Sequence, residues 1–203
     1  MTPDEHRFNA LILMFANLQR LMVFHNSLAM RDGREMDPAL REELTSRLDL
    51  VGQVLERASE AKSVSEADAA AVAPIVPYLQ REVRTLLDTP VDADLGTQAA
   101  LGAAEVYASM WIDEGTIQMG KVFDRPQWVD RSMQNKPMFF ALQNRANAAV
   151  VAAAAKGEYS DEVLADIADH AQAARRNRAQ ALSQVDGLPI MLDGRDAREP
   201  SRA

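Results

Sequence analysis

One stretch near the N-terminus constrains the fold more than any other part of the chain. Residues 8–30, FNALILMFANLQRLMVFHNSLAM, carry a single fixed charge. On a helical wheel with about 100° per residue, the polar positions gather on one narrow strip and the rest of the circumference is apolar. A surface helix usually shows an apolar stripe of little more than roughly 100°. The stretch therefore predicts a central helix, covered by the rest of the chain or by a second subunit, whose polar strip holds Asn9, Asn17, Arg20 and Ser27.

The same stretch does not suit a membrane span or a signal peptide. A span needs about 20 consecutive apolar residues, whereas polar residues interrupt positions 17–27. Asp4 and Glu5 stand where a signal peptide has basic residues. Thr2, Pro3 and Glu5 instead supply an N-cap, a proline in the first helical turn and a capping-box partner. We therefore expect a cytoplasmic protein with no membrane partner.

Composition narrows the function classes. Apolar residues make up 47% and charged residues 26% of the 203 residues, which is normal for a globular domain. The absence of cysteine excludes disulfides and thiolate metal sites within the chain. A net charge of −8 argues against general nucleic-acid binding, which requires a basic surface. Abundant alanine and the lack of any alternating strand pattern favour an all-α fold.

Capping residues, glycines and prolines divide the rest of the chain into helices. Asp37–Pro38 opens a second helix, and Pro74 and Pro77 are expected to break the third. Pro137 is expected to break the fifth in the same way. The sequence predicts one bundle of about six main helices over residues 1–184 and an extended or disordered tail over 185–203. The later helices are expected at about 75–87, 94–122, 126–156 and 161–184.

Polar residues inside apolar faces are the first candidates for function. Gln19, His25 and Asn26 lie within the apolar arc of residues 8–30. Buried polar groups are costly unless they are hydrogen-bonded, so each needs a partner. One interpretation is a polar spot in a pocket, with His25 as acid, base or ligand. The interpretation we favour is a satisfied core histidine, or polar residues that fix the register of a subunit interface.

Glu114 is the second candidate, because it falls in the middle of an apolar arc on the predicted helix 94–122. A buried carboxylate must be paired or protonated. Its segment lacks Lys and Arg between residues 89 and 120, so the cation must come from elsewhere. Arg178 lies at the centre of the apolar arc of helix 161–184. We predict a buried Glu114–Arg178 ion pair and favour a structural role for it over a catalytic one.

An alternative interpretation is a cavity among the helices 8–30, 94–122 and 138–156. Large apolar side chains would line it, and a few polar groups would converge on it, as in many small-molecule sites. Its ligand would be a small apolar molecule. The residues that we assign to this site are His25, Asn26, Tyr107, Trp111, Glu114 and Phe140.

Motifs for catalysis, metals and cofactors are lacking. Asp166 and His170 are four residues apart on one helical face, but two ligands alone are a weak metal signal, and a solvated pair is the preferred interpretation. There is no HExxH motif, phosphate-binding loop or GxSxG elbow. We expect no catalytic residues, no metal and no cofactor.

The sequence thus favours a non-catalytic helical assembly protein, such as an adaptor, a scaffold or a regulatory subunit. Residues 8–30 and a second apolar stretch at 138–155 both need cover, which a homodimer would provide. Another protein is expected as a further partner. The alternative is a helical bundle that binds a small molecule or acts as an enzyme.

Overall fold

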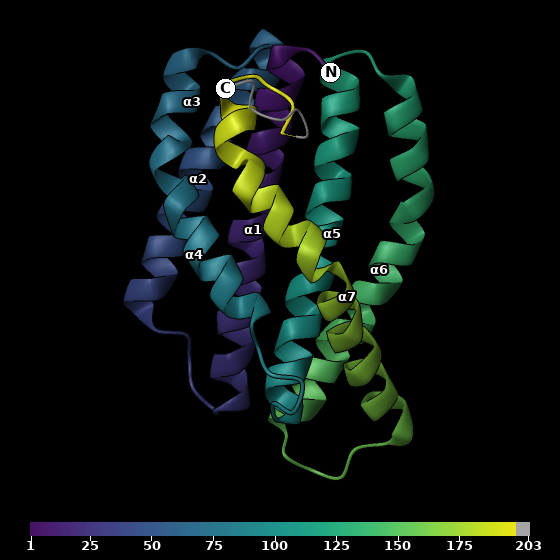
Figure 1. Cartoon of the computed structure of the whole chain (residues 1–203). Helices are drawn as coiled ribbons and strands as arrows, with labels where there is room; N and C mark the ends of the chain where they lie inside the picture. The colour runs from purple at the N-terminus through teal and green to yellow at the C-terminus, as the bar shows by residue number, and fades with distance from the viewer. Residues whose placement is uncertain (198–203) are drawn as a thin grey trace.

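The structure is a computed structural model that describes residues 1–197, and every regular element in this range is helical. The chain folds into an all-α bundle, as the sequence predicts (Figure 1). No helix in the described range is long and apolar enough to cross a membrane. The elements are α1 (Pro3–Arg31), α2 (Pro38–Ala61), α3 (Glu66–Val72), the 3₁₀ helix η1 (Ala73–Ile75), α4 (Val76–Leu87), α5 (Leu95–Val122), α6 (Pro126–Ala154) and α7 (Asp161–Leu192).

Polar caps fix where most of the long helices begin. The Thr2 hydroxyl accepts a hydrogen bond from the Glu5 amide at 3.2 Å, and the Glu5 carboxylate accepts one from the Thr2 amide at 2.6 Å. This reciprocal pair is the capping box that the sequence predicts. At the start of α2, α5 and α7 a single side chain accepts a hydrogen bond from a backbone amide of the first turn, namely that of Asp37, Asp94 and Ser160.

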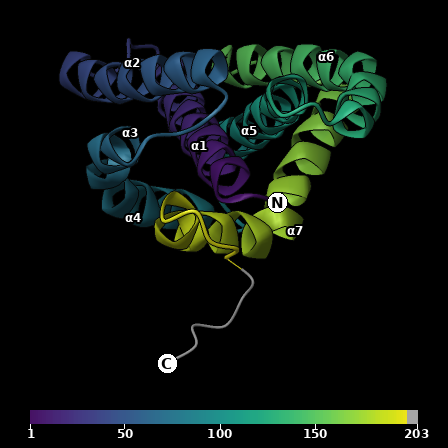
Figure 2. The same cartoon turned by 90° about the horizontal axis from the view of Figure 1, so that it is seen from above.

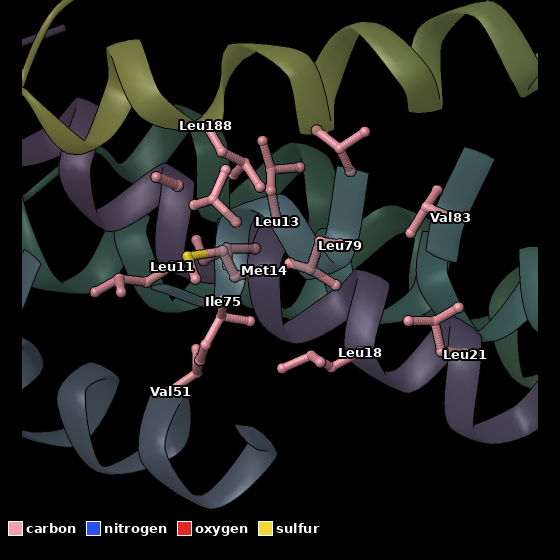
Figure 3. Close-up of a cluster of buried hydrophobic side chains, with 14 of the residues drawn as sticks. Leu11, Leu13, Met14, Leu18, Leu21, Val51, Ile75, Leu79, Val83 and Leu188 are labelled. Carbon is pink, nitrogen blue, oxygen red and sulfur yellow. The ribbon is translucent and has the colours of Figure 1, made fainter. Parts of the chain in front are cut away.

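Helix α1 lies inside the bundle, beside α5 and surrounded by the other long helices (Figure 2). Its leucines and Met14 point into a shared apolar core with α2, α4 and α7 (Figure 3). Burying one such side chain contributes about 1.5–3 kcal/mol, so this contact is a main source of stability. One chain therefore covers its own central helix. The core includes Leu11, Met14, Leu18, Val51, Leu79, Val83 and Leu188.

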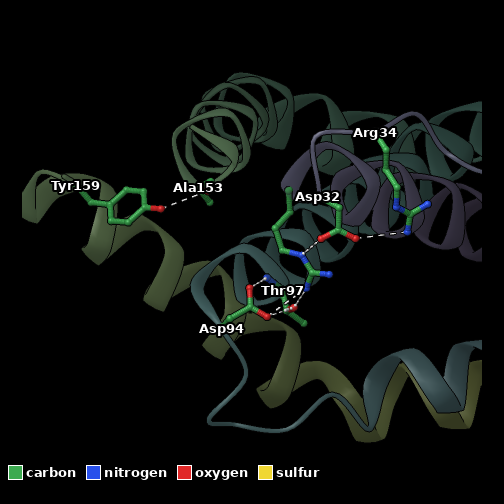
Figure 4. A network of polar contacts seen from close by, with 7 residues as sticks. Asp32, Arg34, Asp94, Thr97, Ala153 and Tyr159 are labelled. Atoms are coloured by element: carbon green, nitrogen blue, oxygen red, sulfur yellow. Dashed lines mark hydrogen bonds and ion pairs between the residues drawn. The ribbon is translucent and has the colours of Figure 1, made fainter. Parts of the chain in front are cut away.

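Helices α1 and α5 are antiparallel and held together along their whole length. Near one end, Gly115 lets α5 approach α1 so closely that a Cβ there would overlap the side chain of Ile12. At the other end, the Arg31 guanidinium donates to the Asp94 carboxylate at 3.1 Å and also to the Thr97 hydroxyl (Figure 4). These contacts fix the register in which α5 presents its side chains.

The predicted break at Pro137 is wrong, and a second helix also continues through a proline. Helix α6 runs unbroken through Pro137. Proline has no N–H to donate to the carbonyl of Met133, four residues earlier. Because Pro137 is exposed, this carbonyl lies on the solvent side of the helix. Helix α7 likewise continues through Pro189 to Leu192. There the freed Val185 carbonyl accepts a hydrogen bond from the Gln80 amide at 3.4 Å.

The predicted tail over 185–203 is therefore wrong for residues 185–192, which form the end of α7. Val185 and Leu188 are completely buried, and Met191 and Leu192 nearly so. Their spacing places them on one helical face against the core, and this burial outweighs the helix-breaking tendency of Gly187 and Pro189. The last part of the predicted tail, residues 198–203, lies outside the described range.

Candidate functional site

The buried ion pair of this protein joins Arg20 of α1 to Glu105 of α5, and the predicted Glu114–Arg178 pair is absent. The Arg20 Nη2 atom lies 3.0 Å from Oε2 of Glu105, and the two side chains are 2% and 7% exposed. Glu114 instead pairs with Lys136 of α6 at 2.8 Å, at the surface. Arg178 pairs with Asp88 and donates to the Leu87 carbonyl at 3.2 Å.

The path of α7 explains this difference. Helix α7 crosses the first half of α5, where His170 packs against Gly102. It then turns towards the end of α4, where Arg178 meets Asp88. Further along α5, Asp113 and Thr116 still line a cavity shared with α7, whereas Glu114 faces the grooves on the other side of α5. A helical wheel cannot show this, because it gives the face on which a residue lies but not which helix packs against that face.

Arg20 and Glu105 are the centre of a polar network in the core. Arg20 donates to the Asn17 amide oxygen at 2.5 Å, and the Asn177 amide donates to Glu105 at 3.1 Å. Burial lowers the pKa of the Arg20 guanidinium, and the charge and hydrogen bond of Glu105 oppose this shift. The Arg20 Nε atom has no hydrogen-bond partner within residues 1–197. The sequence places Asn17 and Arg20 on the polar strip of α1, and the structure shows that this strip is buried as well.

His25 and Asn26 do not reach Glu114. Phe15 of α1 stacks edge-on against Trp111 of α5, with ring centroids 5.1 Å apart. His25 lies ten residues further along α1, about 15 Å away at 1.5 Å per residue. Burial lowers the pKa of His25, and the charge of Glu82 opposes this shift. Asn26 is exposed, and its amide lies 3.8 Å from the Met30 sulfur. The predicted His25–Asn26–Glu114 site is therefore not formed.

The remaining predicted site residues lie along one face between α5 and α6. A groove of about 370 Å³ is lined by Trp111, Glu114 and Phe140, together with Met110 and Lys136. Phe140 is 58% exposed. Tyr107 lies one turn earlier on α5, and its hydroxyl accepts a hydrogen bond from the Asn147 amide at 3.2 Å.

A second groove of about 440 Å³ lies on the other side of the same two residues of α5, between α1, α2 and α5. Trp111 and Glu114 line both grooves. Its apolar lining comes from α1 and α2, and two glutamates of α2 stand at its rim. The lining includes Phe8, Ile12, Phe15, Leu55, Glu56 and Glu60.

A third cavity, of about 210 Å³, lies among α1, α5, α6 and α7. Its wall holds Ser109, Asp113 and Thr116 of α5, and Arg20 and Glu105 also line it. Three cavities thus surround residues 109–116 of α5, none of which is fully buried, although residues 99–106 are. We call residues 109–116 the open segment of α5. The adjacent Asp113 and Glu114 in an alanine-rich helix are its only sign in the sequence.

His170 is buried and isolated rather than solvated as expected. Its two ring nitrogens have no hydrogen-bond partner within residues 1–197. Burial lowers its pKa, the charge of Arg145 adds to this shift, and Asp166 and Asp169 oppose it. Asp166 binds Arg145. The described residues contain no group of three or more His, Asp or Glu side chains placed to hold a metal ion.

Comparisons of the chain with protein-family models, with curated proteins and with solved structures find no match.

Proposed function

We propose that this protein is a helical interaction protein that binds an amphipathic helix of a partner protein along the open segment of α5. The observation that carries the proposal is the incomplete cover of a central helix. Residues 109–116 follow a run of residues, 99–106 of the same helix, that are all buried, yet grooves of about 370 and 440 Å³ flank them. A surface of this kind suits a partner that supplies the missing cover.

The apolar side chains in the two grooves suit helix-in-groove recognition. In that mode an amphipathic helix lays its apolar face into a hydrophobic groove through anchors spaced three or four residues apart. Trp111 stands between the grooves, with Phe15 on one side and Phe140 on the other. Aromatic side chains of this kind often dominate the binding energy of an interface.

The charge at the groove rims indicates the chemistry of the partner. Glu56 and Glu60 are exposed at the rim of the larger groove and form no ion pair within residues 1–197. Glu114 lies between the grooves with Lys136 as its partner. This acidic rim favours a helix whose apolar anchors are flanked by Lys or Arg, because complementary charge guides association and selects partners.

The proposal is tested with a fluorescent amphipathic helix of leucine and lysine, measured by anisotropy. We expect binding by the native chain and at least roughly tenfold weaker binding by Trp111→Ala and Phe140→Ser. Met138→Ser is a matched control, because Met138 is 51% exposed on α6 but lines neither groove. A scrambled peptide of the same composition should bind weakly. Equal binding of both peptides, or full affinity in Trp111→Ala, would contradict the proposal.

The volumes of the grooves favour a second candidate function, the binding of a small apolar molecule. Small-molecule sites measure roughly 300–1,000 Å³ and combine an apolar lining with a few polar groups. Here the polar groups would be Glu114 and Lys136. Native mass spectrometry of the purified chain tests this candidate. A discrete adduct that disappears in Trp111→Ala would support it, and an adduct-free spectrum would favour the protein partner.

A further inference from the structure

The outward face of α6 carries an apolar stripe where a peripheral helix normally has charges. Helix α6 lies at the edge of the bundle (Figure 2), and its buried residues include Ala146, Ala149, Val150 and Ala153. On the opposite side, the seven exposed residues from Met133 onward fall within about 80° of one another on a helical wheel, and the exposed Pro126 and Asp130 precede them in the same arc. We call these seven residues the α6 stripe: Met133, Pro137, Phe140, Asn144, Ala148, Val151 and Ala155.

The stripe is exposed and almost free of charge. Phe140 and Val151 are each 58% exposed, and Met133 is 49% exposed. Residues 132–155 contain only two charged side chains, in a chain of which 26% is charged. Both are already paired within the bundle, Lys136 with Glu114 and Arg145 with Asp166. Contiguous exposed apolar surface of this kind marks an interaction site.

The separations between neighbouring stripe residues are symmetrical about Asn144, so they are the same when read from either end of the stripe. Its seven positions are separated by four, three, four, four, three and four residues, with Asn144 in the middle. If a second α6 packs against it in the opposite direction about a two-fold axis, Asn144 faces its own copy. Large side chains then face small ones, so that Met133 meets Ala155 of the second copy and Phe140 meets Ala148 of the second copy. An interface of this type is self-complementary, as a two-fold dimer requires.

We propose that two copies of this chain form a homodimer through antiparallel packing of their α6 stripes. The two Asn144 amides meet at the two-fold axis, where each donates one hydrogen bond and accepts another. A shift of one turn would place each amide against an apolar side chain and leave it unpaired, so Asn144 fixes the register. Cover of α1 plays no part in this dimer, because one chain already buries α1.

A parallel dimer fits the stripe less well. It would also pair Asn144 with its copy, but Phe140 would meet Phe140 and Ala148 would meet Ala148. The two Phe140 side chains would hold the helices apart, and a gap would remain between the two Ala148 side chains. Such a gap loses favourable van der Waals contacts. The antiparallel arrangement gives an even separation along the stripe.

Sedimentation equilibrium tests the dimer. The native chain is expected at twice its mass of 22.4 kDa. Val151→Glu and Ala148→Glu each bury an unpaired carboxylate against an apolar side chain of the second copy and should raise the dissociation constant at least about a hundredfold. Met138→Glu is the matched control, because Met138 is as exposed as Met133 but lies off the stripe. It should remain dimeric, and circular dichroism should show all variants folded. A monomeric native chain, or a dimer that survives both stripe variants, would overturn the proposal.

Cysteine cross-linking tests the direction of packing, since the chain has no cysteine of its own. A disulfide requires Cα atoms within about 7 Å. Under oxidation, a mixture of Phe140→Cys and Ala148→Cys should give the mixed dimer, whereas Ala148→Cys alone should give almost none. Strong cross-linking of Ala148→Cys alone would overturn the antiparallel arrangement. Phe140 belongs both to the stripe and to the smaller groove, so the dimer covers part of that groove. Val151 lines neither groove, and Val151→Glu should therefore bind the leucine–lysine helix at least as tightly as the native chain, which separates this proposal from the proposed function.

Discussion

Arg20 and Glu105 join the two central helices through an ion pair of 3.0 Å that is almost inaccessible to solvent. Arg20 also donates a hydrogen bond to Asn17, and Glu105 accepts one from Asn177, so most polar atoms of the pair are hydrogen-bonded. A buried ion pair is seldom more stabilising than well-packed apolar residues, but the loss of one partner leaves an uncompensated charge in the core. The pair therefore fixes how α1 and α5 fit together more than it adds to net stability.

Removing one partner should be far more damaging than removing both. Glu105→Leu leaves the Arg20 charge buried and should lower the free energy of unfolding by about 3–5 kcal/mol. Arg20→Met combined with Glu105→Leu should recover most of this loss. Urea denaturation of the two variants measures the difference. If the double variant is no more stable than Glu105→Leu, the cost does not come from an uncompensated charge.

Substitutions at two glycines distinguish the effect of close helix packing on stability from the effect of helix propensity. A Cβ at Gly115 would overlap Ile12, so Gly115→Ala should destabilise the fold by about 1–3 kcal/mol as α1 and α5 are pushed apart. Gly52 in α2 is the matched site, because a Cβ there would lie 3.9 Å from Phe15, an ordinary contact. Gly52→Ala should instead stabilise the helix by up to about 1 kcal/mol. Thermal denaturation of both variants checks the opposite signs.

His170 should make the protein less stable in mild acid. Its pKa in the folded state is lowered by burial and by Arg145, against the opposing charges of Asp166 and Asp169. As the pH falls below the unfolded value of about 6.5, the unfolded chain therefore takes up a proton that the folded chain does not. Stability is full above that pH and decreases below it, by at most about 1.4 kcal/mol per pH unit for one such group.

The variant His170→Leu should weaken this dependence and leave a remainder from His25, whose pKa is also lowered. Urea denaturation between neutral and mildly acidic pH provides the measurement. An unchanged slope in the variant would show that His170 does not remain neutral in the folded protein.

Much of the fold is predictable from the sequence because local rules set it. Thr2, Asp37 and Ser160 begin helices as their capping chemistry demands, and the apolar circumference of residues 8–30 does correspond to a central helix. The predictions fail where tertiary contacts override a local signal. Val185 and Leu188 are buried against the core and Gln80 satisfies the carbonyl that Pro189 frees, so α7 continues where a tail is expected.

The candidate site is only partly predictable for a related reason. Trp111, Glu114 and Phe140 do converge, because their helical faces coincide where α5 meets α6. The pairing of Glu114 with Arg178 fails, because Glu114 faces the grooves beside α1, α2 and α6, whereas Arg178 faces the end of α4. Periodicity gives the direction in which a side chain points from its helix axis, but it does not say which other helix packs beside that side chain.

The open segment of α5 is tested most directly by the fluorescence of Trp111. Trp128→Phe leaves Trp111 as the only tryptophan, since the chain contains two. Acrylamide should quench Trp111 in the free protein, and a saturating leucine–lysine helix should protect it and shift its emission to shorter wavelength. A Trp111 that is already shielded in the free protein, or whose quenching does not change with the peptide, would contradict a binding surface at residues 109–116.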